Sequence, residues 1–132
     1  MKICNETGYA LLAVGYVARH KDKPTIPSHS IAREYDMPLE YLLRILQRLV
    51  KANILRSKRG PRGGYSLARP PKQITMLQII EAVEGPIVNQ FSLKEQAPKE
   101  RFSANAERVY ERALAKGKDV FQKVKFSELL GD

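Results

Sequence analysis

The sequence has little cysteine and no tryptophan. Its single cysteine, Cys4, excludes an internal disulfide and any metal site built from several cysteines. Long hydrophobic runs are also missing, because the longest apolar stretch, residues 9–18, is interrupted by Gly15 and is too short to cross a bilayer. No basic and then apolar leader opens the sequence. These absences predict a soluble, cytoplasmic protein without a membrane partner.

Acidic residues are missing from the centre of the chain. Between Tyr41 and Ile80 there is no Asp or Glu, whereas this stretch contains Arg44, Arg48, Lys51, Arg56, Lys58, Arg59, Arg62, Arg69 and Lys72. Residues 1–75 hold 14 basic and 5 acidic side chains (+9), and residues 76–132 hold 9 of each. A field of one sign predicts a polyanionic partner, namely nucleic acid. An anionic membrane surface is the weaker alternative, since an interfacial helix favours Trp or Phe on its apolar face.

An amphipathic helix begins at Pro38 and ends just before Asn53, which suits the left-handed position after a helix. Its apolar face carries Leu39, Leu42, Leu46, Leu49 and Val50, and its other face carries Glu40, Tyr41, Arg44, Gln47, Arg48 and Lys51. A shorter helix over residues 28–35 precedes it after a tight link. Two helices joined in this way indicate a helix-turn-helix.

A short basic hairpin follows directly. Residues 54–59 alternate like a strand, residues 60–64 (GPRGG) form a turn that needs positive φ, and residues 65–67 return. The arrangement predicts a winged helix-turn-helix that grips duplex DNA. In that geometry the second helix enters the major groove and the wing contacts the backbone or the minor groove.

We therefore expect two sets of DNA contacts. The predicted base-reading residues are Leu39, Glu40, Tyr41, Leu43 and Arg44. The predicted backbone or minor-groove contacts are Ser28, Gln47, Arg48, Lys51, Lys58, Arg59, Arg62 and Gly63. The alternative is an ordinary exposed hairpin with solubilising charges.

The remaining elements predict a dimer. A very apolar helix over residues 7–20 needs burial on more than one side. Thr75 and Gln78 form a capping-box pattern before a helix over residues 76–84. Residues 87–102 are expected to be a loop, and a long amphipathic helix spans residues 103–123 before a terminal turn at 126–130. The predicted dimer-interface residues are Tyr9, Leu12, Tyr16, Ala106, Val109, Tyr110, Ala113, Gly117, Val120 and Phe121. Packing within the chain is the alternative.

The expected fold is thus mainly α with a small β-hairpin wing. Residues 1–86 form the winged helix-turn-helix DNA-binding domain, residues 87–102 form a loop, and residues 103–132 form a dimerisation helix with a tail.

Several stretches resemble the Rrf2 family of bacterial transcriptional regulators. They are Tyr9-Ala10-Leu11, the helix around Tyr41-Leu42, the wing RGPRGGY (residues 59–65) and IIEAVEGP (residues 79–86). The resemblance implies a homodimeric winged-helix regulator whose long C-terminal helices cross between subunits. Cluster-binding members carry three cysteines after the Glu-Gly-Pro stretch, and residues 87–105 contain no Cys or His. We therefore predict no iron–sulfur cluster and no other cofactor.

A second departure concerns the operator. Iron–sulfur members have Glu and Gln where this chain has Leu43 and Arg44, and Arg44 could pair bidentately with guanine. The operator sequence of the known regulators should therefore not be assigned to this chain.

No metal site or catalytic centre is expected. His20 and His29 lack a metal-ligating partner, and no Ser/His/Asp grouping, phosphate loop or paired carboxylates occur, so the protein is not an enzyme. Cys4 is either a possible redox thiol or, as we favour, a small buried residue. We interpret the chain as a dimeric repressor that binds a palindromic operator. The alternatives are control by a protein partner and sequence-blind binding of nucleic acid, and the identity of a protein or small-molecule effector stays open.

Overall fold

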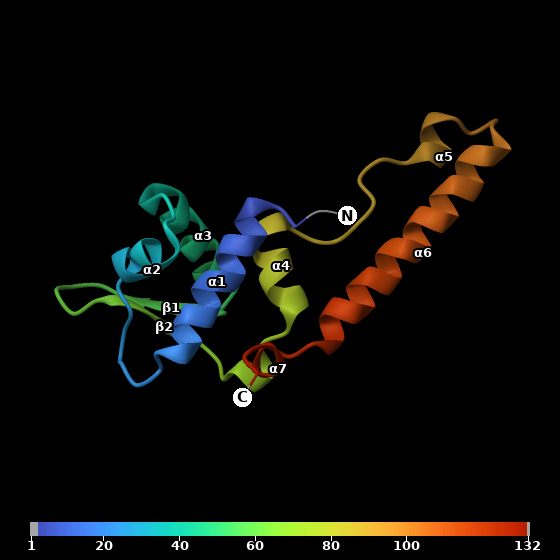
Figure 1. Cartoon of the computed structure of the whole chain (residues 1–132). Helices are drawn as coiled ribbons and strands as arrows, with labels where there is room; N and C mark the ends of the chain where they lie inside the picture. The colour runs from blue at the N-terminus through green and yellow to red at the C-terminus, as the bar shows by residue number, and fades with distance from the viewer. Residues whose placement is uncertain (1–2, 132) are drawn as a thin grey trace.

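The computed structural model describes residues 3–131, and Figure 1 shows how its elements are arranged. The elements are α1 (Asn5–Arg19), α2 (Ser28–Tyr35), α3 (Leu39–Lys51), β1 (Leu55–Lys58), β2 (Gly64–Leu67), the 3-10 helix η1 (Pro71–Gln73), α4 (Met76–Glu84), α5 (Leu93–Gln96), α6 (Arg101–Lys123) and α7 (Phe126–Leu129). Most described residues are helical, and β1 and β2 form an antiparallel hairpin. The predicted fold class is confirmed.

Helix α3 is packed into the core by its apolar stripe. Leu42, Leu46 and Leu49 are fully buried, and the helix contacts α1, α2, α4 and β1. Leu39 was placed on the apolar face of the helix by its sequence position. It is nevertheless 42% exposed, because it lies at the start of α3. The other face of α3 remains open to solvent. Asn53 ends the segment in the left-handed conformation, with φ of 60°, as predicted.

Helix α1 is buried on several sides by its own chain. It contacts α2, α3, α4 and β2, and residues such as Ala10, Ala13 and Val14 are fully buried. The apolar circumference that predicted a partner subunit is therefore largely covered within the protomer. The helix also begins at Asn5, two residues earlier than expected from the sequence.

The hairpin projects from the body as a wing (Figure 1). Its register runs from Leu55 opposite Leu67 to Lys58 opposite Gly64. Ile26, which precedes α2, pairs with Tyr65 through two backbone hydrogen bonds of 2.8 Å. The base of the wing is thus attached to the segment that leads into the helix-turn-helix.

Helix α4 begins with the predicted capping box. The Gln78 backbone N–H donates to Thr75 Oγ1 (3.1 Å), and the Thr75 N–H donates to Gln78 Oε1 (2.9 Å). The chain returns to this point after α6, because the Phe126 N–H donates to the Ile74 carbonyl at 2.7 Å and the Phe126 ring is buried. The start of α4 and the end of α6 are therefore fixed to each other.

The segment between α4 and α6 differs from the predicted loop. It contains the short helix α5, capped by the Ser92 side chain, and α6 begins at Arg101 rather than at residue 103. A four-residue helix is too short to show a hydrophobic period, which is why the sequence did not reveal it. Beyond its contacts with α4 and α5, α6 stands apart from the body (Figure 1).

Truncation of Leu46 should destabilise the fold strongly. We expect Leu46→Ala to lower the free energy of unfolding by about 2–5 kcal/mol, because it removes a fully buried side chain and leaves a cavity. Urea unfolding at one fixed protein concentration measures this change. Leu43→Ala, on the same helix but 37% exposed, is the control and should cost far less. Equal losses in the two variants would contradict the assigned packing of α3.

Candidate nucleic-acid interface

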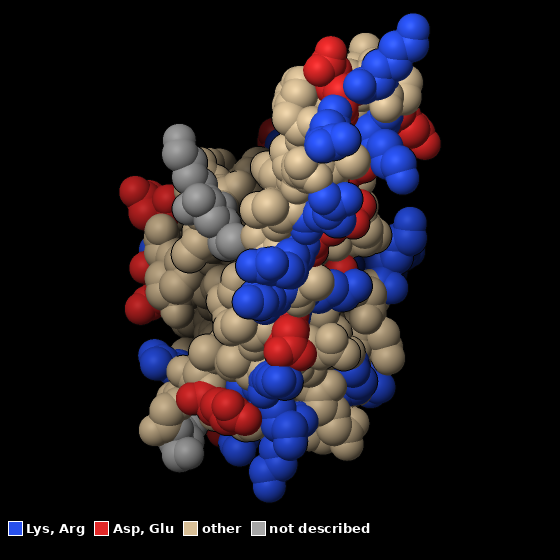
Figure 2. Space-filling view, turned by 90° about the vertical axis from the view of Figure 1, so that its right-hand side faces the viewer, with Lys and Arg blue, Asp and Glu red and all other residues tan. Residues whose placement is uncertain are grey.

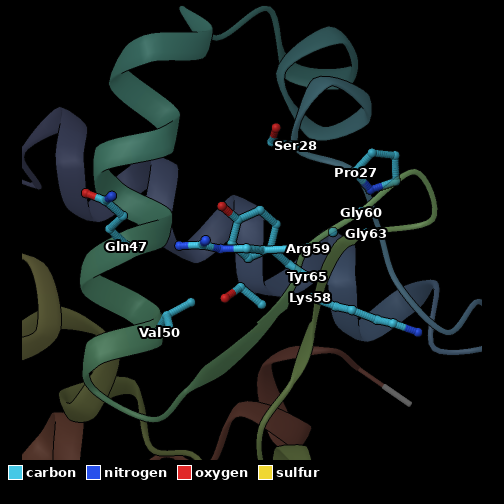
Figure 3. A pocket seen from close by; sticks show the side chains of 11 residues that line it. Pro27, Ser28, Gln47, Val50, Lys58, Arg59, Gly60, Gly63 and Tyr65 are labelled. Carbon is cyan, nitrogen blue, oxygen red and sulfur yellow. The ribbon is translucent and has the colours of Figure 1, made fainter.

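A groove separates α3 from the wing. It has a volume of about 420 Å³, and its walls come from the start of α2, the middle of α3 and the hairpin. The residues that line it are Pro27, Ser28, Gln47, Val50, Ser57, Lys58, Arg59, Gly60, Gly63, Gly64 and Tyr65. Figure 3 shows Gln47 and Val50 on one side and the wing on the other. Ser28, Gln47, Lys58, Arg59 and Gly63, which were predicted as separate backbone contacts, therefore meet in one place.

Side chains of the wing point in different directions around this groove. Arg59 extends from the hairpin toward α3, whereas the amine end of Lys58 points away from α3 (Figure 3). Arg62 is exposed near the tip of the hairpin. The wing can therefore present cations both to the groove and to its outer side.

Glycines are required where the hairpin turns and meets the body. Gly64 has φ of 149°, and a Cβ at this position would lie 2.5 Å from the Ile26 carbonyl oxygen. A Cβ on Gly63 would clash with the Lys58 carbonyl oxygen. The tip is further held by Thr25, whose hydroxyl donates to the Arg62 carbonyl at 2.8 Å. The wing is consequently held at a defined position beside α3.

The exposed face of α3 carries most of the predicted base-reading residues. Leu39, Glu40, Leu43 and Arg44 are exposed. Lys51 is also exposed, on the last turn of the helix. Apolar side chains such as Leu39 and Leu43 can contact thymine methyl groups, whereas a guanidinium can bind guanine. These four predicted base-reading residues lie within the first two turns of α3, which is the part that reaches base edges in helix-turn-helix proteins.

Tyr41 is partly buried against α1 instead of standing free on this face. Its ring meets Tyr9 edge-on at 5.5 Å, and the Arg44 guanidinium lies 5.5 Å from its centroid. Desolvation and the nearby Glu6 carboxylate raise the pKa of the Tyr41 hydroxyl. Tyr41 is thus placed to orient Arg44 through a cation–π contact.

Arg48 is held partly within the protomer. Its guanidinium donates to Glu6 at 2.9 Å and to the Val83 carbonyl at 3.0 Å, so it links α3 to α1 and to α4. Both bonds come from Nη1, and the Arg48 side chain remains 48% exposed. The predicted backbone contact of Arg48 with DNA therefore stays a prediction.

Two contributions to this site could not be found in the sequence. Thr25 and Ile26 hold the wing, and Glu6 engages Arg48, but each partner lies far away along the chain. None of these three residues belongs to a local motif.

The predicted dimer residues fall into two groups. Tyr9 and Tyr16 pack inside the protomer, Tyr16 against Tyr35 and His20, and only Leu12 of the three residues in α1 is exposed. On α6 the exposed members are Ala106, Val109, Tyr110, Ala113 and Val120, whereas Gly117 and Phe121 are half-buried. On the side that carries α6, Lys and Arg are interspersed with Asp and Glu (Figure 2).

One stripe of α6 has the spacing of a coiled-coil seam. Its members are Phe102, Ala106, Val109, Ala113, Lys116 and Val120, which are separated by alternating steps of four and three residues and are all exposed. Steps of this kind keep side chains on one side of a helix that pairs with another helix. Nothing within the described residues covers this stripe.

The fold and the groove define a class of protein, the winged helix-turn-helix proteins with a long C-terminal helix. A model of the Rrf2 family, described as iron-dependent transcriptional regulator, matches residues 3–132. The chain therefore belongs to the Rrf2 family of transcriptional regulators.

Individual relatives agree with this assignment. The transcriptional regulator IscR of Aliivibrio salmonicida is 34% identical over 84 residues, which are 64% of this chain and 50% of that protein. Among solved structures, CymR, the global cysteine regulator of B. subtilis, has a TM-score of 0.78 at 27% identity and covers 99% of this chain and 97% of its own. IscR of T. potens has a TM-score of 0.75 at 26% identity, with coverages of 100% and 88%. The chain spans about half the length of the curated relatives it matches.

The donor atoms of this chain do not fit an iron–sulfur cluster. The segment that joins α4 to α6 has no Cys or His, and Cys4 lies before α1, where its Sγ is 3.3 Å from Thr7 Oγ1. Within residues 3–131 no three His, Cys, Asp or Glu side chains gather as a metal site. In the same part of the chain no helix is long and apolar enough to span a membrane.

A methyl group at position 64 should displace the wing. We expect Gly64→Ala to lower the free energy of unfolding by at least about 1 kcal/mol, because alanine disfavours this φ and its Cβ meets the Ile26 carbonyl. Thermal unfolding followed by circular dichroism measures the effect. Gly8→Ala, in helix α1 with no atom within 4 Å of the added Cβ, is the matched control and should be neutral or stabilising. Unchanged stability of Gly64→Ala would argue against the attachment at Ile26.

Proposed function

We propose that this protein is a homodimeric transcriptional regulator that binds duplex DNA sequence-specifically, acts as a repressor in the cytoplasm and carries no iron–sulfur cluster. The observation that carries the proposal is the basic groove between the exposed face of α3 and the wing. Lys58 and Arg59 line this groove, Arg44 and Arg62 are exposed on α3 and at the tip of the wing, and Glu40 is the only acidic residue between positions 37 and 80. Such a surface suits the phosphate-lined edge of a duplex groove.

The two arms of the surface would read different parts of DNA. With α3 in the major groove, Arg44 faces base edges, and Leu39, Glu40 and Leu43 supply the neighbouring contacts. Ser28 of α2 and Gln47 and Lys51 of α3 would contact the phosphates. Lys58, Arg59, Arg62 and Gly63 of the wing would contact the backbone or the minor groove, where a narrow groove attracts arginine.

The exposed stripe of α6 supports dimer formation with a second copy of this chain. Its heptad-like spacing favours pairing of two α6 helices, and burial of Val109 and Val120 would remove apolar surface from water. Two-fold symmetry would place two α3 helices on successive major grooves, so the operator should be palindromic. We propose repression because a small dimer that occupies an operator blocks transcription by its presence on the DNA. It needs no further protein-binding surface for this.

Footprinting tests the proposal most directly. The full-length protein is incubated with the DNA upstream of its own coding region, and a scrambled fragment of the same length competes. A protected, palindromic site that resists this competitor is expected, because phosphate contacts alone show no sequence preference. Equal competition by scrambled DNA would indicate a sequence-blind binder. A visible absorbance band of a cluster after anaerobic preparation would contradict the cluster-free assignment.

Substitution of Arg44 and Arg62 should separate base reading from backbone contact. Arg44→Ala should relax selectivity at one base pair at a cost of about 1–3 kcal/mol, whereas Arg62→Ala should weaken all sequences alike and reduce the salt slope by about one. Fluorescence anisotropy titrations on the operator and on single-base variants at several salt concentrations measure both effects. The roles assigned to the two arginines are wrong if the two variants behave identically.

A charge in the α6 stripe should prevent pairing. Val109→Glu places a carboxylate at a side chain that is 64% exposed in the protomer and buried in the proposed dimer. We expect analytical ultracentrifugation to show half the mass of the parent protein, and operator affinity to fall with it. Val88→Glu, at a valine that is 56% exposed outside the stripe, is the control and should remain dimeric. Retention of the dimer by Val109→Glu would place the interface elsewhere.

A further inference from the structure

The wing has a second basic face, on the side away from α3. Side chains along a strand alternate between the two faces of a sheet. Ser57 of β1 lines the groove beside α3, so its neighbours Arg56 and Lys58 belong to the opposite face. Although Lys58 borders the groove, its amine end points away from α3 (Figure 3). Both cations are exposed.

This face continues across β2 onto the segment that joins α1 to α2. Ser66 lies opposite Arg56 in the register of the hairpin, and side chains directly opposite each other share one face of a sheet. Ser66 also lines a hollow of about 230 Å³, whose other wall includes Lys21 and Lys23. The outer face of the wing is therefore a continuous surface bordered by four cations, Lys21, Lys23, Arg56 and Lys58.

The segment that carries the two lysines is attached to the wing. Ile26 exchanges two backbone hydrogen bonds of 2.8 Å with Tyr65, and the Thr25 hydroxyl donates to the Arg62 carbonyl at 2.8 Å. Lys23 is only two positions before Thr25 in the chain. The cations of the segment and those of the hairpin are consequently held beside one another.

The charge on the outer face is mostly of one sign. Its four cations are exposed, and none of them forms a salt bridge within residues 3–131. Asp22, between the two lysines, is the only acidic residue between positions 6 and 34. A surface with such an excess of positive charge attracts a polyanion.

Two basic faces on opposite sides of one hairpin fit the two walls of a DNA groove. Each wall of the minor groove is a sugar-phosphate strand, so a wing whose tip enters the groove has one strand on either side. Arg59 extends toward α3 and would meet the strand nearer the reading helix. Arg56 and Lys58 would meet the other strand, because they belong to the opposite face.

We propose that the outer face of the wing is a second phosphate-binding surface, which holds the DNA strand on the side of the minor groove away from α3. This inference rests on the proposed DNA-binding function and extends it to residues outside the groove between α3 and the wing. Contacts to phosphates position a protein on the duplex without reading its sequence. The outer face should therefore strengthen binding to all sequences alike.

Substitution of the two loop lysines in the full-length protein tests this surface. Each phosphate contact contributes about 0.9 to the dependence of log affinity on log salt concentration, so Lys21→Gln/Lys23→Gln should reduce this slope by about two. The preference for the operator over its single-base variants should stay unchanged. Lys94→Gln/Lys99→Gln is the matched control, because it removes the same charge from exposed positions at and after α5, away from the wing (Figure 1), and should keep the parent's slope. Fluorescence anisotropy titrations measure all of these quantities.

Hydroxyl-radical footprinting identifies the strand that each face contacts. The parent protein should protect sugars on both strands of the minor groove at the wing. Adding Arg56→Gln to the double lysine variant should abolish protection of the strand away from α3 and keep that of the nearer strand. Arg59→Gln should have the reverse effect. The substituted side chains are exposed, so the variants should unfold at the parent's temperature, which circular dichroism checks.

Different results would contradict different parts of the argument. The outer face does not bind phosphate if Lys21→Gln/Lys23→Gln has the same salt slope as the Lys94→Gln/Lys99→Gln control. Loss of protection on both strands alike in the triple variant would contradict the assignment of the outer face to one wall of the groove. If the parent protein binds no duplex DNA at all, the proposed function itself is wrong.

Discussion

The burial of one face of α3 is the constraint on which the rest of the structure depends. Leu42, Leu46 and Leu49 are fully withdrawn from water, so the rotation of the helix about its axis is fixed. Each apolar side chain buried in this way contributes about 1.5–3 kcal/mol. Rotation by about half a turn would exchange these leucines for Arg44 and Gln47. The orientation of the basic face is therefore a consequence of core packing, and no specific contact of the basic residues is needed to produce it.

The wing is positioned by backbone geometry in contrast to this hydrophobic packing. Ile26 and Tyr65 exchange hydrogen bonds, and Gly64 allows the two backbones to approach more closely than any side chain would permit. The flexible arginine side chains are thus carried by a rigid base. Arg59 can reach into the groove because it directly follows β1, and the hairpin is fixed relative to α2 and α3.

Local patterns predicted the elements well, and long-range pairing explains what they missed. The bounds of α2 and α4, the Thr75 capping box and the left-handed Asn53 follow from neighbouring residues alone. The role of Arg48 depends on Glu6, 42 positions away, so a helical wheel could assign it only to a polar face. The apolar circumference of α1 likewise could not show whether its own chain or a second copy covers it. The sequence predicted which surface is basic, but not how Tyr41 and Arg48 make contacts with α1.

Helix α6 carries two apolar stripes on different sides. A helix that pairs with a second copy needs an apolar outer stripe, and a helix anchored to the body needs an apolar inner one. With both stripes present, charged residues remain between them, which accounts for the mixed charge on that side of the molecule. The anchor lies at the C-terminal end, where Val124 and Phe126 bond to Met76 and Ile74. Since the start of α4 and the end of α6 are joined there, the direction in which α6 leaves the body is set at this end of the helix.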